Sequence, residues 1–221
     1  MKVCTDACIL GAWVAEAVAS GQLQATRCLD IGAGTGLLSL MLAQKSSAKI
    51  TSIEIDKNAF TQAIDNFKTS LWSERLKALH TDAKNYYEDR KYDLIISNPP
   101  FFEDDLLSPA KIKNVAKHDE SLKLNELILV IKRNLDSKGN FAVLLPFRRV
   151  NYFEGIAIEN VFFLKEKLLI KHTAYHNYFR SILIFSKLKI DSPFIKELVI
   201  KNKEGSYTDD FAELMSDYYL E

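Results

Sequence analysis

The sequence predicts an α/β fold: a mostly parallel sheet of seven strands, with an antiparallel strand at one edge and helices on both faces. Apolar, strand-like runs alternate with amphipathic, helix-like runs through the first two thirds of the 221 residues, which is βαβα order. A glycine-rich turn joins the first strand to the first helix. The last third contains two β-rich runs without a crossover helix between them, which predicts an antiparallel pair at the sheet edge.

The first two thirds supply five strands and three helices, each predicted from its periodicity. In the second helix Phe60, Ile64 and Phe67 share one face. Pro99 and Pro100 end the fourth strand, because proline has no N–H to donate to a sheet. The expected strands are 27–31, 49–54, 76–80, 92–97 and 141–145, and the expected helices are 37–45, 57–69 and 122–135.

The last third is expected to contain strands at 161–170 and 181–188, joined by a segment rich in histidine and aromatic residues at 172–179. Residues 209–220 predict a C-terminal amphipathic helix with Phe211, Leu214 and Tyr218 on one side. No linker separates these segments, so we expect a single domain over residues 1–221, and we expect a monomer.

Composition excludes several classes of protein. Hydrophobic residues make up 48% and charged residues 26%, which is unlike disordered, collagen or coiled-coil chains. Lysine plus arginine and aspartate plus glutamate each number 29, so a nucleic acid would have to meet a local basic face. The longest uncharged apolar stretch, 31–44, is too short to span a membrane. Three cysteines give no disulfide framework and fit a reducing cytoplasm.

Residues 29–36 read Leu-Asp-Ile-Gly-Ala-Gly-Thr-Gly, so three of the chain's eight glycines fall between a strand and a helix. Glycine permits a tight turn and a close approach of the backbone to a ligand. The fingerprint of NAD-binding proteins is not matched, because Leu37 stands where its third glycine belongs. A P-loop is also excluded, since no Gly-Lys-Ser/Thr follows.

Two acidic residues follow the next strands. Glu54 ends the second strand, where a carboxylate in a doubly wound sheet accepts hydrogen bonds from ribose hydroxyls. Asp82 follows the third strand and can accept a hydrogen bond from an adenine amino group. The alternative is an ordinary loop with solvated strand ends, which the repeated placement of acids makes the weaker interpretation.

Residues 97–102 read Ser-Asn-Pro-Pro-Phe-Phe and follow the fourth strand. The prolines fix the backbone, so the side-chain oxygen of Asn98 and the carbonyl oxygen of Pro99 form two acceptors at set positions. They can hold both hydrogens of one planar NH2 group while Phe101 stacks on its ring. This favours a pyramidal nitrogen with a free lone pair, and no general base is needed before transfer. A rigid turn with Phe101 and Phe102 in the core is the alternative.

Together these motifs resemble those of the class I, Rossmann-like methyltransferases that use S-adenosylmethionine. The resemblance implies that fold, that cofactor, a cofactor half at about 1–100 and a substrate-facing half at about 101–221. It also implies catalytic roles for Asn98, Pro99 and Phe101, as in enzymes that methylate adenine N6 or a glutamine amide. The implied cofactor-binding residues are Asp30, Gly32, Gly34, Gly36, Glu54, Asp82 and Asn98.

A closer resemblance extends over nearly the whole chain, to the bacterial tRNA1(Val) adenine-37 N6-methyltransferase family. It is carried by Lys-Val-x-Thr-Asp at 2–6, Leu-Gly-Ala-Trp at 10–13, Ala-Lys-His at 116–118 and Tyr-Thr-x-x-Phe at 207–211. It implies tRNA as the partner and cofactor contacts for Thr5 and Asp6. Cys4 stands where that family usually has glycine, and the chain begins almost at this motif, whereas relatives usually have a short upstream segment.

The substrate side is expected to be basic and aromatic. Residues 147–189 contain eight lysines and arginines but only three glutamates. The basic residues are interleaved with Tyr175, Tyr178 and Phe179, and this combination suits the binding of phosphates and unstacked bases. The loop at 103–123 is expected to close over a flipped base. A solvated face is an equally weighted alternative for this charge excess. The expected substrate-binding residues are Pro100, Phe102, Lys117, His118, Arg148 and Arg149, and no metal site is expected.

The first hypothesis is therefore an RNA adenine-N6 methyltransferase acting on tRNA, with adenine 37 of tRNA1(Val) implied as the target. A protein glutamine-amide N5 methyltransferase is the nearest alternative, but such enzymes usually have tyrosine at position 101 and an added N-terminal helical domain. A DNA adenine-N6 methyltransferase usually needs a separate recognition domain. A non-catalytic binding module is the alternative of another class.

Overall fold

The structure is a computed structural model, which describes residues 4–100 and 122–219. Its strands are β1 (Arg27–Ile31), β2 (Lys49–Glu54), β3 (Leu76–His80), β4 (Tyr92–Ser97), β5 (Leu135–Pro146), β6 (Phe163–Thr173), β7 (Arg180–Ser186) and β8 (Phe194–Lys201). Its α-helices are α1 (Thr5–Ala19), α2 (Leu37–Lys45), α3 (Lys57–Thr69), α5 (Leu124–Asn134), α6 (Val150–Glu159) and α7 (Asp209–Met215).

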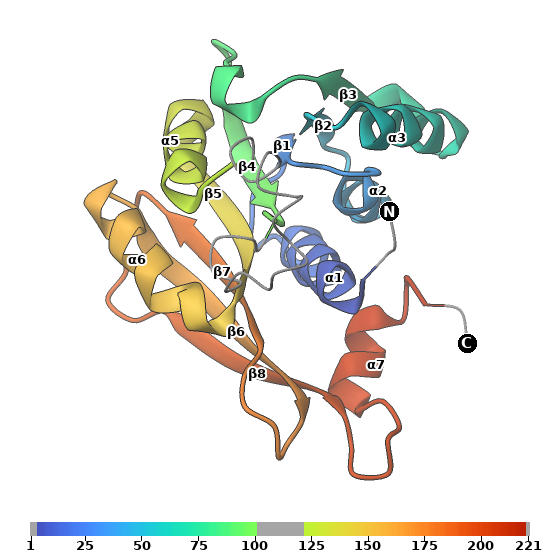
Figure 1. Ribbon diagram of the computed structural model, residues 1–221, viewed down its shortest axis with the longest axis vertical. Helices are drawn as coiled ribbons and strands as arrows, with labels where there is room; N and C mark the ends of the chain where they lie inside the picture. The colour runs from blue at the N-terminus through green and yellow to red at the C-terminus, as the bar shows by residue number, and fades with distance from the viewer. Residues whose placement is uncertain (1–3, 101–121, 220–221) are drawn as a thin grey trace, which may run out of the picture.

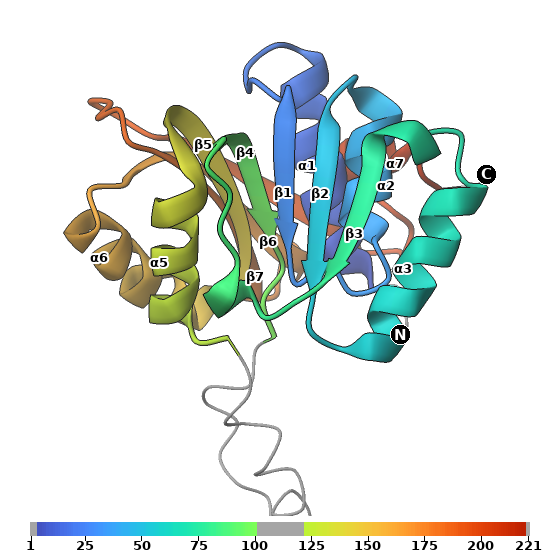
Figure 2. The same cartoon turned by 90° about the horizontal axis from the view of Figure 1, so that it is seen from above.

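The strands form one sheet in the order β3-β2-β1-β4-β5-β7-β6-β8 within the described residues. Helices α1, α2 and α7 cover one face, and α5 and α6 cover the other (Figures 1 and 2). Successive residues of β1 point to opposite faces of the sheet. Cys28 belongs to the core under α1, α2 and α7, and Leu29 belongs to the core under α5 and α6. Figure 2 shows β1, β2 and β3 ending at the same edge of the sheet. The expected α/β class is confirmed.

The strand count and the place of the antiparallel strand need correction. Strand β7 runs antiparallel to both β5 and β6, but it lies inside the sheet. The edge is β8, an eighth strand that pairs in parallel with β6. The first four residues of β8 are exposed, and only Leu198 and Ile200 in this strand are buried. Its sequence therefore lacks the regular apolar alternation that predicts a strand.

Two helices were also not predicted. Helix α1 contributes buried residues on nearly all sides because it lies between the sheet, α2 and α7, so it has no amphipathic stripe. Its Gly11 lies against α2, where an added Cβ would be 2.4 Å from the Met41 sulfur. Helix α6 buries Val150, Phe153 and Ala157, a helical spacing that could have predicted it.

Some expected boundaries shift. The expected helix at 122–135 is α5, which is Leu124–Asn134, and the strand expected at 141–145 extends over Leu135–Pro146 as β5. Gly139 lies inside β5, which has an irregular register against Tyr92 and Leu94 of β4. The last helix ends earlier than expected, at Met215. Within residues 4–100 and 122–219, no helix combines the length and apolar character needed to cross a bilayer.

Candidate active site

A cavity of about 990 Å³ lies at the carboxyl ends of the central strands. The glycine turn after β1, the ends of β2 and β4, and the residues after β3 form its first side. Residues from the start of α1, the end of β5 and the start of β7 form the other. In open α/β sheets, ligands bind at the point where the strand order reverses, here between β1 and β4. The volume lies within the range of small-molecule and cofactor sites.

The glycine turn presents bare backbone to this cavity. Gly32, Gly34 and Gly36 have φ values of +71°, +57° and +86°, in the left-handed region that favours glycine. The N–H groups of Gly32 and Ala33 donate to the Ile53 carbonyl of β2, at 2.9 and 3.1 Å, and fix the turn. An added Cβ on Gly32 would meet nothing within 4 Å, so a ligand can approach the backbone there.

Gly36, which was predicted to bind the cofactor, lies away from the wall of the cavity. An added Cβ would lie 2.4 Å from the Phe67 ring of α3. In this structure, Gly36 allows the turn to pack closely against α3. This could not be predicted from the sequence, because the contact joins residues that are 31 positions apart.

Replacing Gly36 by alanine is expected to cost about 2–5 kcal/mol of unfolding free energy, from left-handed strain and overpacking. Gly205→Ala is the matched control, since Gly205 has a φ of +85° and nothing within 4 Å of an added Cβ. It is expected to cost only about 1–2 kcal/mol. Denaturant unfolding measures both values, and equal losses would show that the Phe67 contact does not contribute.

Glu54 connects the end of β2 to the glycine turn and lines the cavity. Its Oε2 accepts a hydrogen bond from Gly34 N–H at 2.8 Å, and its Oε1 accepts one from Asp56 N–H at 2.8 Å. Each carboxylate oxygen has a further lone pair. Glu54 can therefore hold the turn and still accept two ribose hydroxyls, so the residues here fit the nucleoside part of S-adenosylmethionine.

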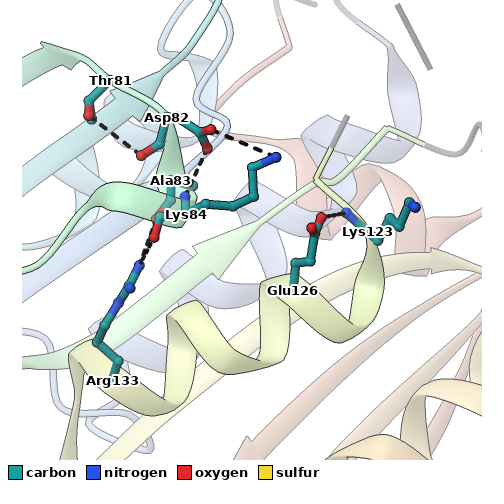
Figure 3. A network of polar contacts seen from close by, with 7 residues as sticks. All are labelled: Thr81, Asp82, Ala83, Lys84, Lys123, Glu126 and Arg133. Carbon is teal, nitrogen blue, oxygen red and sulfur yellow. Dashed lines mark hydrogen bonds and ion pairs between the residues drawn. The ribbon is translucent and has the colours of Figure 1, made fainter. Parts of the chain in front are cut away.

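Asp82 begins a short helical turn, Ala83–Asn85, on the cavity wall (Figure 3). Its Oδ1 accepts a hydrogen bond from Lys84 N–H at 2.9 Å, and its Oδ2 is 3.8 Å from Lys84 Nζ. Arg133 of α5 anchors the turn by donating from Nη2 to the carbonyls of Ala83 and Lys84, at 3.0 and 2.7 Å. Sequence reasoning missed Arg133, which lies on an element remote in the chain.

Asp30 lies behind the glycine turn and not on the cavity wall. It is fully buried, and its Oδ2 accepts a 2.8 Å hydrogen bond from Ser39, whose hydroxyl is 2.7 Å from that of Ser52. Burial raises the pKa of Asp30 to about 7, and the charge of Glu54 adds to the shift, while the Ser39 hydrogen bond opposes it. In this structure Asp30 supports the turn from behind.

The raised pKa of Asp30 predicts a pH dependence of stability. The folded state holds the proton more tightly than an unfolded aspartate, whose ordinary pKa is 3.8. This contribution to stability is therefore complete below about pH 4 and lost as the pH rises to about 7, with a slope of at most about 1.4 kcal/mol per pH unit. Asp30→Asn should lack it. The unfolding free energies of the wild type and Asp30→Asn should be measured from pH 4 to pH 7. A constant difference between the two proteins over this range would contradict the raised pKa of Asp30.

Asn98 lies directly after β4 on the cavity wall, followed by Pro99 and Pro100. Its Oδ1 is buried and has no hydrogen-bond partner within the described part of the chain. The Ser97 hydroxyl donates to the Ile31 carbonyl at 2.9 Å and fixes this end of β4 to β1. A buried acceptor without a donor fits an NH2 group entering the cavity. Phe101 and Phe102 lie outside the described residues.

The N-terminal residues Thr5 and Asp6 are not on the cavity wall, whereas their neighbours Cys4 and Ala7 are. Asp6 instead binds Arg180, whose Nε donates to Oδ2 at 2.8 Å, and Arg180 lines the cavity. Burial acts to raise the pKa of Asp6, but hydrogen bonds from the Cys4 thiol and from Arg180, with its positive charge, lower it overall. Asp6 therefore does not line the cavity itself but contacts two residues that do, Cys4 and Arg180.

On the substrate-facing side, the structure separates the two expected arginines. Arg148 lines the cavity, whereas the Arg149 guanidinium lies 4.5 Å from the centre of the Tyr152 ring on α6. Lys117 and His118 lie outside the described residues. Sequence reasoning missed Phe147, which also lines the cavity. Its position directly after β5, at the edge where the other site residues lie, was the available signal.

Cys4 and Cys8, and also His172 and His176, are spaced four residues apart, as metal ligands can be, but neither pair has a third ligand beside it among the described residues. His172 stacks on Phe179 with ring centroids 3.8 Å apart, and His176 Nδ1 is 2.7 Å from the Thr173 hydroxyl. Cys4 is exposed and Cys8 is buried. Across residues 4–100 and 122–219, the structure contains no group of three or more His, Cys, Asp or Glu residues placed to hold a metal ion.

Comparisons of the sequence agree on one family. Residues 14–153 match the family model of the methyltransferase small domain. A tRNA1(Val) (adenine(37)-N6)-methyltransferase of Dyadobacter fermentans is 41% identical, with 100% of this chain and 91% of that protein covered. One of the same name from Flavobacterium johnsoniae is 34% identical, covering 100% of this chain and 93% of the relative.

Solved structures share the fold. A predicted O-methyltransferase from Agrobacterium tumefaciens superposes with a TM-score of 0.72 at 17% identity, covering 96% of each chain. A methyltransferase from Thiobacillus denitrificans, solved with S-adenosyl-L-homocysteine, gives a TM-score of 0.55 at 17% identity, covering 72% of this chain and 66% of that one. At such identities the similarity supports the Rossmann-like methyltransferase fold.

Proposed function

Because the chain belongs to the methyltransferase small domain family, and within it to the tRNA1(Val) (adenine(37)-N6)-methyltransferases, we propose that it methylates the exocyclic N6 amine of an adenine in tRNA. S-adenosylmethionine is the methyl donor, and adenine 37 of tRNA1(Val) is the proposed target. The relatives' names favour tRNA over the protein-amide and DNA alternatives. The reaction takes place in the cytoplasm.

The observation that carries this proposal is the buried Oδ1 of Asn98, which has no hydrogen-bond partner among residues 4–100 and 122–219. Asn98 Oδ1 and the Pro99 carbonyl accept the two N–H hydrogens of the adenine N6 amine. This contact draws the nitrogen out of conjugation with the ring and turns its lone pair toward the methyl carbon. S-adenosylmethionine, when bound, would supply the methyl group, its sulfonium S–C bond breaking as the new N–C bond forms. The surplus proton on N6 then leaves to water.

The remaining residues of the cavity hold and orient the donor, which supplies an electrophilic methyl group. Glu54 would accept hydrogen bonds from the ribose hydroxyls. Because no atom lies where a side chain of Gly32 would be, the donor can come close to the backbone there. Asp82, which follows β3, would accept a hydrogen bond from the amino group of the donor's adenine. Asp30 and Gly36 maintain the turn without touching the donor.

A pair of tRNA transcripts tests this function. One is tRNA1(Val) with adenosine at position 37, and the other differs only by guanosine at that position. We expect labelled methyl from S-adenosylmethionine to enter the first transcript and not the second. Equal labelling of both would move the target away from position 37. Labelling of neither transcript, together with methylation of a glutamine amide in a protein mixture, would replace the proposal.

A further inference from the structure

Two aromatic rings at the rim of the cavity have no part in the methyl transfer described above. Phe147 and Tyr178 have ring centroids 5.1 Å apart and planes tilted by 46°, and both line the cavity. Phe147 is 40% exposed, although a phenyl ring gains free energy from burial. We refer to these two side chains as the aromatic ledge. Tyr178 is partly buried, and an aromatic pair that is partly exposed beside a binding cavity offers a stacking surface.

The backbone under the ledge is fixed. Phe147 begins the turn that follows β5, and Tyr178 lies two residues before β7. The Phe147 N–H donates to the Phe179 carbonyl at 3.1 Å, which joins the two segments. Phe179 is in turn stacked on His172 of β6. The ledge is therefore built on the junction of three neighbouring strands.

The Tyr178 ring is also held from its far end. Its hydroxyl donates to Glu197 Oε2 at 2.5 Å, and Lys171 Nζ lies 2.9 Å from the same oxygen. The ammonium of Lys171 is 4.5 Å from the centre of the Tyr178 ring. Glu197 and Lys171 belong to the paired strands β8 and β6. A ring ordered in advance loses little conformational entropy when a ligand stacks on it.

The charge around the ledge suits a nucleic acid. Lys171 lies against Tyr178, and Arg148 follows Phe147 on the cavity wall. Glu197 is the acid in contact with Tyr178, and its carboxylate is already bound by both Lys171 and the tyrosine hydroxyl. Positive side chains beside aromatic rings are the combination that binds single-stranded RNA through phosphates and stacked bases.

We propose that the aromatic ledge stacks a base next to the target adenine in a single-stranded loop of the RNA substrate, which rests on the function proposed above. An adenine that enters the cavity leaves its own stack, so its neighbour loses a stacking partner. The ledge lies at the rim, where that neighbour must pass, and replaces the lost contact. Stacking tolerates any base, so the ledge contributes affinity rather than sequence recognition.

The test compares two RNA hairpin loops in a fluorescence anisotropy assay, one intact and one with abasic sites on both sides of the target adenosine. The wild-type protein should bind the intact loop about 10-fold more tightly. Phe147→Leu and Tyr178→Ala should lose most of this preference, whereas Tyr178→Phe keeps the ring and should retain it. Tyr87→Ala is the control, since Tyr87 is 55% exposed and has Lys91 Nζ 4.1 Å from its ring centre, away from the cavity wall.

If the wild type, Phe147→Leu and Tyr178→Ala all prefer the intact loop over the abasic loop by the same factor, the proposal that the ledge stacks a base is overturned. Loss of the preference in Tyr87→Ala would overturn it as well. Thermal unfolding of each variant checks that it is folded, and Phe147→Leu and Tyr178→Phe keep apolar bulk at the two sites. Because affinity is measured without turnover, this result is independent of methyl transfer. Formation of N6-methyladenosine on the intact loop by the wild type tests the proposed function separately.

Discussion

Replacement of Asn98 by alanine is expected to lower kcat for tRNA about 100- to 1,000-fold, the loss typical when a donor or acceptor in the transition state is removed. The physical reason is the buried Oδ1, which has no partner in the described residues and belongs to a residue that lines the cavity. Alanine leaves one of the two N–H groups of the amine without an acceptor. Most contacts to S-adenosylmethionine remain, so calorimetry should show a largely preserved affinity for it.

Asn134→Ala is the matched control for this variant. Asn134 is also buried with an unpartnered Oδ1 in the described residues, but it lies on α5 and not on the cavity wall. Its Nδ2 donates to the carbonyls of Val130 and Tyr86, at 2.9 and 3.3 Å. We expect a loss of about 1–3 kcal/mol of stability with nearly unchanged kcat. An Asn98→Ala enzyme with wild-type turnover would remove Asn98 from the mechanism.

Glu54→Gln is expected to weaken binding of S-adenosylmethionine about 10- to 100-fold, the range for a lost hydrogen bond to a charged group. The carboxylate accepts from the N–H groups of Gly34 and Asp56 in the structure, and from the ribose hydroxyls in the proposed complex. A glutamine amide presents NH2 to one of these donors. It therefore disturbs the glycine turn and also removes an acceptor from the ligand.

Glu88→Gln provides the comparison for Glu54. Glu88 binds Arg27 at 2.7 Å, at the start of β1 and so at the opposite end of that strand from the glycine turn. Burial acts to raise the pKa of Glu88, but hydrogen bonds from Tyr86, Tyr92 and Arg27, together with the Arg27 charge, lower it overall. Its replacement should affect stability and leave cofactor affinity intact. Titration calorimetry distinguishes the two variants, and equal affinities for Glu54→Gln and the wild type would contradict the ribose contact.

The central strands and helices could be predicted from the sequence because the burial of each one is visible in the pattern of its own apolar residues. The four strands β1 to β4 and helices α2 and α3 have the expected bounds. Parallel strands are buried on both faces, so they appear as apolar runs. Helix α1 is buried nearly all round and β8 is half exposed, so neither has the periodicity on which such predictions depend.

In the candidate site, too, some residues could be placed from the local sequence and others could not. The position of Glu54, Asp82 and Asn98 on the cavity wall could be predicted because each lies at the carboxyl end of a strand or just after it, and these ends meet at one edge of a parallel sheet. The packing of Gly36 against Phe67 and the burial of Asp30 behind the turn depend on contacts between distant segments. The same is true of the Asp6–Arg180 pair, which spans 174 positions. Such contacts leave no local pattern in the sequence.

The most direct test of the central claim is nucleoside mass spectrometry of a tRNA pool from cells that lack this gene, incubated with the protein and S-adenosylmethionine. We predict a rise in N6-methyladenosine with the wild-type protein and no comparable rise with Asn98→Ala. A methyl group on another nucleoside atom, or no methylated nucleoside while calorimetry shows that the cofactor binds, would contradict the assignment of this site to adenine N6 methylation.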